Sequence, residues 1–126
     1  MPLMEVFILK KLMLIANPYS GKGQAKLALI DVISCFNNAD YMVTVFTPNS
    51  DTGRDIQSIV STYASEYDIV VCIGGDGTLS DTANGLMKCQ SAPPVGYIPT
   101  GSTNDMASSL TIPKSPAAAA QSIIDG

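Results

Sequence analysis

The sequence predicts an α/β fold with an open parallel sheet, and three observations support this class. Four short apolar runs rich in valine and isoleucine are typical of strands buried on both faces. Helical patterns fall between these runs, so strands and helices alternate along the chain. With 126 residues, of which 46% are apolar, the chain has the size of one domain around one core. The alternation implies right-handed crossovers in a doubly wound sheet.

The expected elements follow one another in a regular order. Strands are predicted at residues 12–16, 42–46, 69–73 and 95–98, and helices at about 24–36, 54–67, 78–87 and 115–124. The second helix has the clearest pattern, because Ile56, Ile59, Val60, Tyr63, Ala64 and Tyr67 recur at the spacing of one helical face. In the last helix, Pro116 suits the first turn and Gly126 suits the C-terminal cap. Residues 1–9 either extend the first strand or form a loose arm.

Composition excludes several classes of function. Seven Lys and Arg against eleven Asp and Glu give a net charge of -4, so no overall field favours nucleic acid. The absence of histidine excludes Ser-His-Asp and Cys-His nucleophiles, and zinc sites that need an imidazole. Cys35, Cys72 and Cys89 lack a C-x-x-C spacing and are interpreted as small buried residues in a reducing cytoplasm. The short N-terminal apolar run precedes its lysines, the reverse of a signal peptide, so a cytosolic protein is expected.

Four polar segments each follow a predicted strand directly. They are rich in Gly, Asn, Asp, Ser and Thr, and they cover residues 17–23, 47–53, 74–78 and 99–105. In a parallel sheet these segments share one edge, at the carboxyl ends of the strands, where open α/β sheets bind ligands. The sequence therefore predicts a ligand site at this edge.

The first segment precedes a helix whose N-terminus suits a phosphate, with Lys22 and Lys26 adding positive charge. It is not a Walker A loop, because Ala16 replaces the first glycine of that motif and Gly23 follows Lys22 where Ser or Thr is required. An ordinary strand-to-helix turn explains this segment equally well.

The segment 74–78 carries more weight for function. Its three glycines let the backbone approach a ligand closely, while the carboxylate of Asp76 can bind Mg²⁺, a water or a hydroxyl. The alternative is that Asp76 only caps the following helix. Capping and solvation explain Asp81 and Asn84 better than a ligand does. A G-x-G-x-x-G fingerprint is absent, which disfavours a Rossmann dehydrogenase.

The two remaining segments each allow two interpretations. Thr47 adds a hydroxyl to the edge, yet a cap by Asp51 for the helix that carries Arg54 explains that segment equally well. Ser102 to Asp105 open a short helix, whose donors suit a phosphate or a ribose as well as simple capping.

Three motifs together resemble one known family. N-P-x-S-G-K, then G-G-D-G-T-L followed by N-G-L, then P-x-G-S-T-N-D occur in this order over nearly the whole chain. The combination resembles the catalytic domain of the diacylglycerol kinase family, and bacterial lipid kinases especially. NAD kinases and phosphofructokinases share G-G-D-G, but neither has the first and last motifs together. Asp81 stands where the family commonly has Glu, and Ser102 where Thr is usual, so both keep the functional group.

The resemblance implies an ATP-dependent lipid kinase, with Mg²⁺, whose N-terminal domain is an open parallel-sheet α/β domain like those of phosphofructokinase and NAD kinase. The ATP contacts that it implies are Asn17, Pro18, Tyr19, Ser20, Gly21, Thr47, Gly74, Gly75, Asp76, Gly77, Thr78, Leu79, Ser80 and Ser102. No catalytic residue or metal ligand is assigned. In this family a β-rich domain follows that carries the lipid site and the general base. Residues 1–126 are therefore expected to be the nucleotide half, inactive or nearly so by themselves.

Two alternatives stay open at the level of function. One is an NAD kinase-like phosphotransferase with a water-soluble acceptor, and the other is a non-catalytic nucleotide-binding regulatory domain. The acceptor of the complete protein is a lipid of undetermined kind, among them diacylglycerol, sphingoid bases, undecaprenol-like alcohols and glycolipids. The resemblance allows peripheral contact with the inner face of the membrane in the complete protein and leaves a homodimer open, and no nucleic acid partner is expected.

Overall fold

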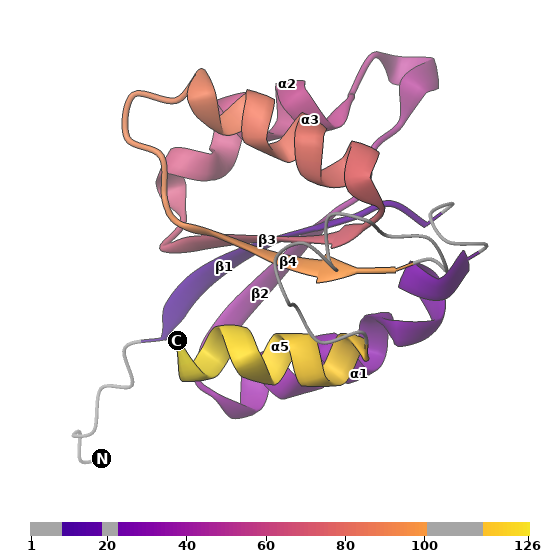
Figure 1. Ribbon diagram of the computed structural model, residues 1–126. Helices are drawn as coiled ribbons and strands as arrows, with labels where there is room; N and C mark the ends of the chain where they lie inside the picture. Colours follow the sequence, from indigo (N-terminus) through magenta and orange to yellow (C-terminus); the bar gives the residue numbers. More distant parts are fainter. Residues whose placement is uncertain (1–8, 19–22, 101–114) are drawn as a thin grey trace, which may run out of the picture.

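The computed structural model describes residues 9–18, 23–100 and 115–126, and it shows a four-stranded parallel sheet between two layers of helices (Figure 1). The strands are β1 (Lys10–Ala16), β2 (Tyr41–Phe46), β3 (Ile69–Gly74) and β4 (Val95–Pro99). The helices are α1 (Gln24–Asn38), α2 (Ile56–Tyr63), α3 (Asp76–Met87) and α5 (Pro116–Asp125), with short 3-10 turns at Ser50–Thr52 and Ala64–Glu66. The predicted parallel α/β class is confirmed.

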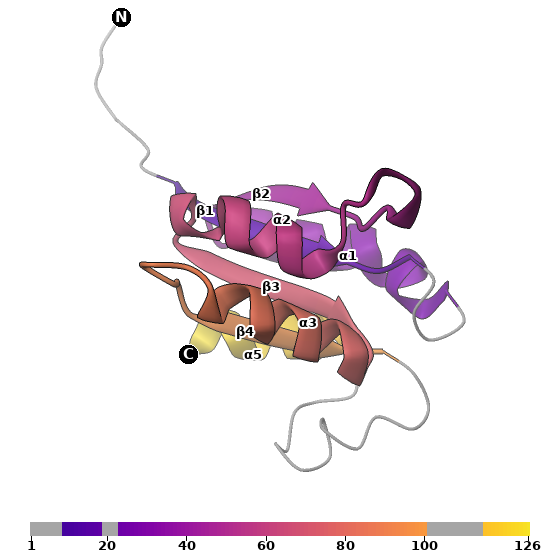
Figure 2. The same ribbon diagram turned by 90° about the horizontal axis from the view of Figure 1, so that it is seen from above.

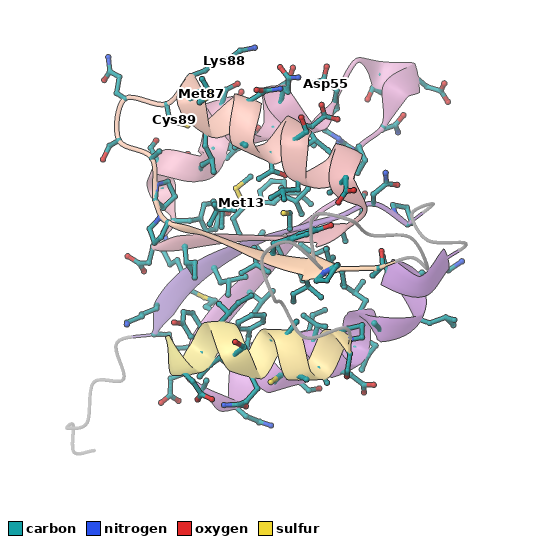
Figure 3. The ribbon with its side chains drawn as sticks, in the orientation of Figure 1. Met13, Asp55, Met87, Lys88 and Cys89 are labelled. Carbon is teal, nitrogen blue, oxygen red and sulfur yellow. The ribbon has the colours of Figure 1, made fainter. Side chains whose placement is uncertain are left out.

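Alternate residues of the central strand β1 supply two separate cores. Leu12 and Leu14 face the layer that contains α1 and α5, whereas Met13 and Ile15 face α2 and α3 (Figure 3). All four side chains are fully buried. Burial on both faces explains why the strand reads as a continuous apolar run rather than as an alternating one. Seen from above, α2 and α3 run side by side over the sheet (Figure 2).

The helix α2 begins later than predicted, at Ile56, because Asp55 is its N-cap. The backbone N–H of Ser58 donates to Oδ1 of Asp55 at 2.7 Å, and this hydrogen bond lowers the pKa of the Asp55 carboxyl. Figure 3 shows Asp55 at the start of this helix. The predicted cap by Asp51 is wrong, since Asp51 lies in the 3-10 turn before the helix.

The end of α2 also differs from the sequence prediction. The helix stops at Tyr63 and continues as a 3-10 turn to Glu66, so Tyr67 lies outside it. Tyr67 nevertheless packs against the core between α2 and the sheet. Its ring meets that of Phe46 edge to face, with the ring centroids 6.1 Å apart. The apolar spacing therefore predicted the burial of Ile56, Ile59, Val60 and Ala64 correctly. Tyr63 of the same predicted face is exposed, and the helix is shorter than predicted.

The last helix runs from Pro116 to Asp125, one residue later at each end than predicted, and Pro116 and Gly126 have the roles that the sequence predicts. Oγ of Ser115 accepts a hydrogen bond from the backbone N–H of Ala118, and Pro116 occupies the first turn. Gly126 has a φ of 93°, the left-handed conformation that glycine adopts at a helix end.

The three cysteines are free, and only Cys72 is fully buried. Burial raises the pKa of the Cys72 thiol to about 12, so the thiol stays protonated and unreactive at neutral pH. Cys35 and Cys89 are half-buried. No helix in the described part of the chain is long and apolar enough to cross a bilayer.

Candidate functional site

The sheet changes direction between β1 and β3. In the strand order β2-β1-β3-β4, the chain moves from β1 to β2 on one side and from β3 to β4 on the other. The strand order therefore switches direction between β1 and β3, and sheets of this kind usually have their ligand crevice at the carboxyl ends of the strands at such a point. The backbone N–H of Asn17 donates to the carbonyl of Ile73 at 3.4 Å, so Asn17 and Pro18 lie beside the glycine segment. Tyr19, Ser20 and Gly21 lie outside the described residues.

The glycine segment is mostly helix and strand, and not the open loop that the sequence predicts. Gly74 is the last residue of β3, and α3 begins at Asp76. Gly75 is the N-cap, which makes the predicted capping role of Asp76 wrong. Asp76, Gly77 and Thr78 thus form the first turn of α3, where backbone N–H groups have no partner within the helix and attract negative charge.

The glycines at positions 74 and 77 are there for different reasons. A Cβ on Gly74 would lie 2.5 Å from Oγ1 of Thr78, so packing excludes a side chain there. A Cβ on Gly77 would have nothing within 4 Å among the described residues, and Gly77 has no positive φ. The fold therefore requires Gly74 but not Gly77. The space beside Gly77 is open to a ligand that approaches the backbone.

The carboxylate of Asp76 is held from the neighbouring strand. The hydroxyl of Tyr97 donates to Oδ1 of Asp76 at 3.3 Å, and it lies 3.5 Å from the carbonyl oxygen of Gly74. Tyr97 is 7% exposed, whereas Asp76 is exposed at the edge of the sheet. The backbone N–H of Thr100 also donates to the Gly74 carbonyl, at 2.9 Å. The end of β4 is thereby tied to the glycine segment.

Three predicted site residues that follow on α3 have different surroundings. Thr78 is 5% exposed, and its carbonyl accepts a hydrogen bond from the hydroxyl of Thr82 at 2.8 Å. Leu79 packs against the core beneath α2 and α3, while Ser80 is exposed. The side chains of Thr78 and Leu79 therefore serve the fold, and Thr78 can offer a ligand only its backbone N–H.

A second part of the edge is a hollow of about 470 Å³ beyond the ends of β1 and β2. Its lining consists of Asn17, Pro18, Thr47, Pro48, Asn49, Asp51 and Arg54. Residues predicted from the first and second polar segments, Asn17 and Thr47, therefore meet in one hollow. Arg54 was not predicted as a site residue, although it is the only arginine in the sequence and follows a polar turn.

The remaining residues considered from the sequence do not lie at this edge in the described part of the chain. Ser102 and Lys22 lie outside the described residues. Oδ1 of Asp81 accepts a hydrogen bond from Nε2 of Gln57 at 3.4 Å, which links α3 to α2. Asn84 is exposed. Within residues 9–18, 23–100 and 115–126, no three His, Cys, Asp or Glu side chains gather to hold a metal ion by themselves.

The fold is that of a doubly wound α/β domain whose strand order switches between β1 and β3, the point at which such domains usually bind ligands. The sequence profile described as "Diacylglycerol kinase catalytic domain" matches residues 11–126. The chain belongs to this family, and the resemblance inferred from three motifs is confirmed.

Similar proteins agree with this assignment. The chain is 33% identical over 119 residues to a diacylglycerol kinase of Bacillus subtilis, covering 94% of the chain and 39% of that protein. It is 33% identical over 117 residues to one of Staphylococcus epidermidis, covering 93% and 37%. A crystal structure of a diacylglycerol kinase from Bacillus anthracis matches with a TM-score of 0.79 at 28% identity, covering 92% and 40%. The chain thus spans about two fifths of the length of these relatives.

Proposed function

We propose that this chain is the nucleotide-binding part of a lipid kinase, which transfers the γ-phosphate of ATP to a lipid hydroxyl. The observation that carries the proposal is the open first turn of α3 at the switch point of the sheet, where nothing described lies within 4 Å of the Cβ position of Gly77. Membership of the diacylglycerol kinase family supports a lipid acceptor.

Phosphoryl transfer depends mainly on positioning and on stabilising charge around the phosphates. The backbone N–H groups of the first turn of α3 would receive the phosphates, with Asn17 on the facing side of the crevice. The exposed carboxylate of Asp76 suits a Mg²⁺ ion that arrives with the phosphates, because Mg²⁺ usually takes one or two carboxylates and completes its shell with phosphate oxygens and water. When bound, this ion neutralises part of the phosphate charge.

The proposal places the lipid pocket and the general base in a part of the protein outside residues 1–126, because the chain spans about two fifths of the length of its relatives. Residues 1–126 would form a single ATP-binding domain that transfers little or no phosphate by itself. A lipid acceptor also implies peripheral contact of the complete protein with a membrane.

The first test is a calorimetric titration of the chain with Mg²⁺-ATP and, separately, with NAD. The proposal expects binding of ATP and not of NAD. Binding of NAD alone would favour an NAD kinase-like protein with a water-soluble acceptor. Binding of neither nucleotide would overturn the proposal that this chain carries the nucleotide site.

Gly77→Ala should separate ligand binding from folding. Alanine removes the backbone freedom of glycine inside a helix and meets no neighbour, so the free energy of unfolding should rise by about 0.5–1 kcal/mol. The same methyl group occupies the space where a phosphate would approach, so affinity for Mg²⁺-ATP should fall several-fold. Denaturant unfolding and calorimetry measure the two effects. Asn84→Ala, two turns further along α3 and exposed, is the control that should gain stability without losing affinity.

Tyr97→Phe tests whether β4 positions the carboxylate of Asp76. Phenylalanine keeps the buried ring but loses the hydroxyl that lies 3.3 Å from Oδ1. We expect the Mg²⁺ dependence of ATP binding to weaken several-fold, while binding of ATP without Mg²⁺ is unchanged. An equal loss of ATP affinity with and without Mg²⁺ would mean that Tyr97 has only a packing role.

A further inference from the structure

We infer that the hollow beyond β1 and β2 receives the nucleoside end of the nucleotide, with Arg54 stacked on the base and Asp51 accepting hydrogen bonds from the ribose hydroxyls. The inference rests on the proposed function, which puts the phosphates at the first turn of α3. It adds an orientation of the nucleotide across the edge, and two residues that recognise it.

The positions of the two parts along the edge support this orientation. The hollow lies beyond β1 and β2, whereas the glycine segment follows β3. Because β1 lies between β2 and β3, and neighbouring strands are about 4.8 Å apart, the two parts are separated by roughly 10 Å. One nucleotide that runs along the edge can reach both. Asn17 lines the hollow and is hydrogen-bonded to β3, so it lies at the passage between them.

The charges in the hollow favour a nucleoside over a phosphate. Asp51 and Arg54 line the same hollow, and among the described residues they form no ion pair with each other. A carboxylate repels phosphate but accepts hydrogen bonds from ribose hydroxyls, as an acidic residue does in dinucleotide-binding folds. The hydroxyl of Thr47 and the amide of Asn49 add neutral groups that suit the edge of a base.

The backbone at Arg54 is fixed by a closed turn. The backbone N–H of Asn49 donates to the carbonyl of Arg54 at 2.8 Å, and that of Arg54 donates back to Asn49 at 3.0 Å. Gly53 has a φ of 71°, a conformation that lets the chain close this turn. The turn thus carries the one arginine of the sequence to a fixed position at the rim of the hollow.

Arg54 also lines a second, more apolar depression beside the hollow. A second depression of about 220 Å³ is lined by Val45, Phe46, Thr47, Arg54 and Tyr63. The rings of Phe46 and Tyr63 are stacked with centroids 5.5 Å apart. A guanidinium between a polar and an apolar depression is suited to lie flat on a base, because its plane is weakly hydrated and stacks on aromatic rings.

The test compares three probes on the chain: Mg²⁺-ATP, inorganic tripolyphosphate with Mg²⁺, and 2′,3′-dideoxy-ATP with Mg²⁺. Arg54→Ala should weaken ATP about tenfold, the effect of one lost base-stacking contact, and leave tripolyphosphate unchanged. Arg54→Lys, which keeps the charge without the plane, should recover only part of the affinity. Asp51→Asn should abolish the preference for ATP over the dideoxy nucleotide. Lys10→Ala, an exposed cation at the opposite edge of the sheet, is the control.

The outcomes distinguish the inference from the function on which it rests. A chain that binds neither ATP nor tripolyphosphate would overturn both. A wild type that binds ATP, combined with an Arg54→Ala variant of equal affinity, would overturn the inference alone. Equal weakening of ATP and tripolyphosphate, with full recovery in Arg54→Lys, would place phosphates at Arg54 and reverse the proposed orientation. Circular dichroism of each variant establishes that the fold is intact.

Discussion

Replacing Asp76 with alanine is expected to lower phosphate transfer to a lipid by roughly 100-fold or more in a protein that also contains the acceptor part, because the variant loses the carboxylate beside the phosphates. The domain should stay folded, since Asp76 is exposed and its side chain accepts a hydrogen bond from the hydroxyl of Tyr97 at the rim of the sheet. That hydroxyl keeps the Gly74 carbonyl within 3.5 Å after the substitution. Transfer of labelled phosphate from ATP to a lipid extract measures the effect.

The control for this prediction is Glu66→Ala, which removes an exposed carboxylate from the 3-10 turn after α2. Its transfer rate should match that of the unaltered protein. An Asp76→Ala variant with normal transfer would remove Asp76 from the site, and one that fails to fold would show that its contact with Tyr97 is structural. Asp76→Asn, which retains a polar group of the same size, separates these cases because it should fold and still transfer poorly.

Gly85→Val is expected to destabilise the domain by about 2–4 kcal/mol, because α2 and α3 touch at this position. A Cβ on Gly85 would lie 2.8 Å from Cβ of Val60 and 2.9 Å from the backbone carbonyl oxygen of Gln57. The backbone atom cannot rotate away, so the helices must separate and expose part of the core beneath them. Typical domains have only about 5–15 kcal/mol of stability, so a large share would be lost.

Unfolding in urea measures this change, and Gly85→Ala should lie between the valine variant and the unaltered chain. Gly77→Ala is the matched control, since it changes glycine in the same helix where nothing described is in the way. A loss below 1 kcal/mol for Gly85→Val would mean that the two helices adjust at little cost and that their contact does not limit the residue at this position.

The sequence could predict the sheet because its strands are buried on both faces. An apolar run such as that of β3, in which Val70 to Ile73 are all fully buried, is typical of a strand covered by helices on both faces. The ends of the helices are harder to predict from the sequence, because each end depends on one or two hydrogen bonds. Asp51 and Asp55 are both plausible caps from sequence, and only the turn between Asn49 and Arg54 places Asp55 correctly.

Part of the candidate site was predicted from the sequence, and the residues that were not predicted depend on contacts in space. The described residues of the polar segments lie at one edge of the sheet, as predicted, because residues that follow parallel strands meet there. Tyr97 was missed because its hydroxyl meets Asp76 only through the pairing of β3 with β4. Arg54 was not predicted as a site residue because the sequence pattern placed it at the start of the second helix. Nor could the sequence tell that Gly74 serves packing while Gly77 does not, since neighbours in space decide this.

The central place of β1 in the sheet has a consequence for the order in which the chain can fold. β1 pairs with β2 and with β3, whose first residue, Ile69, lies opposite Leu12. During synthesis, β1 can pair only with β2 until β3 has left the ribosome, and two strands alone form no stable sheet. The apolar side chains of β1 therefore stay partly exposed until β3 is made. The two strands are some 57 residues apart in sequence, as are Lys11 and Asp68, whose carboxylate accepts a hydrogen bond from the backbone N–H of Lys11. Pairing over such distances is slow, so α1, made between the two, is the first element that can shield the strand.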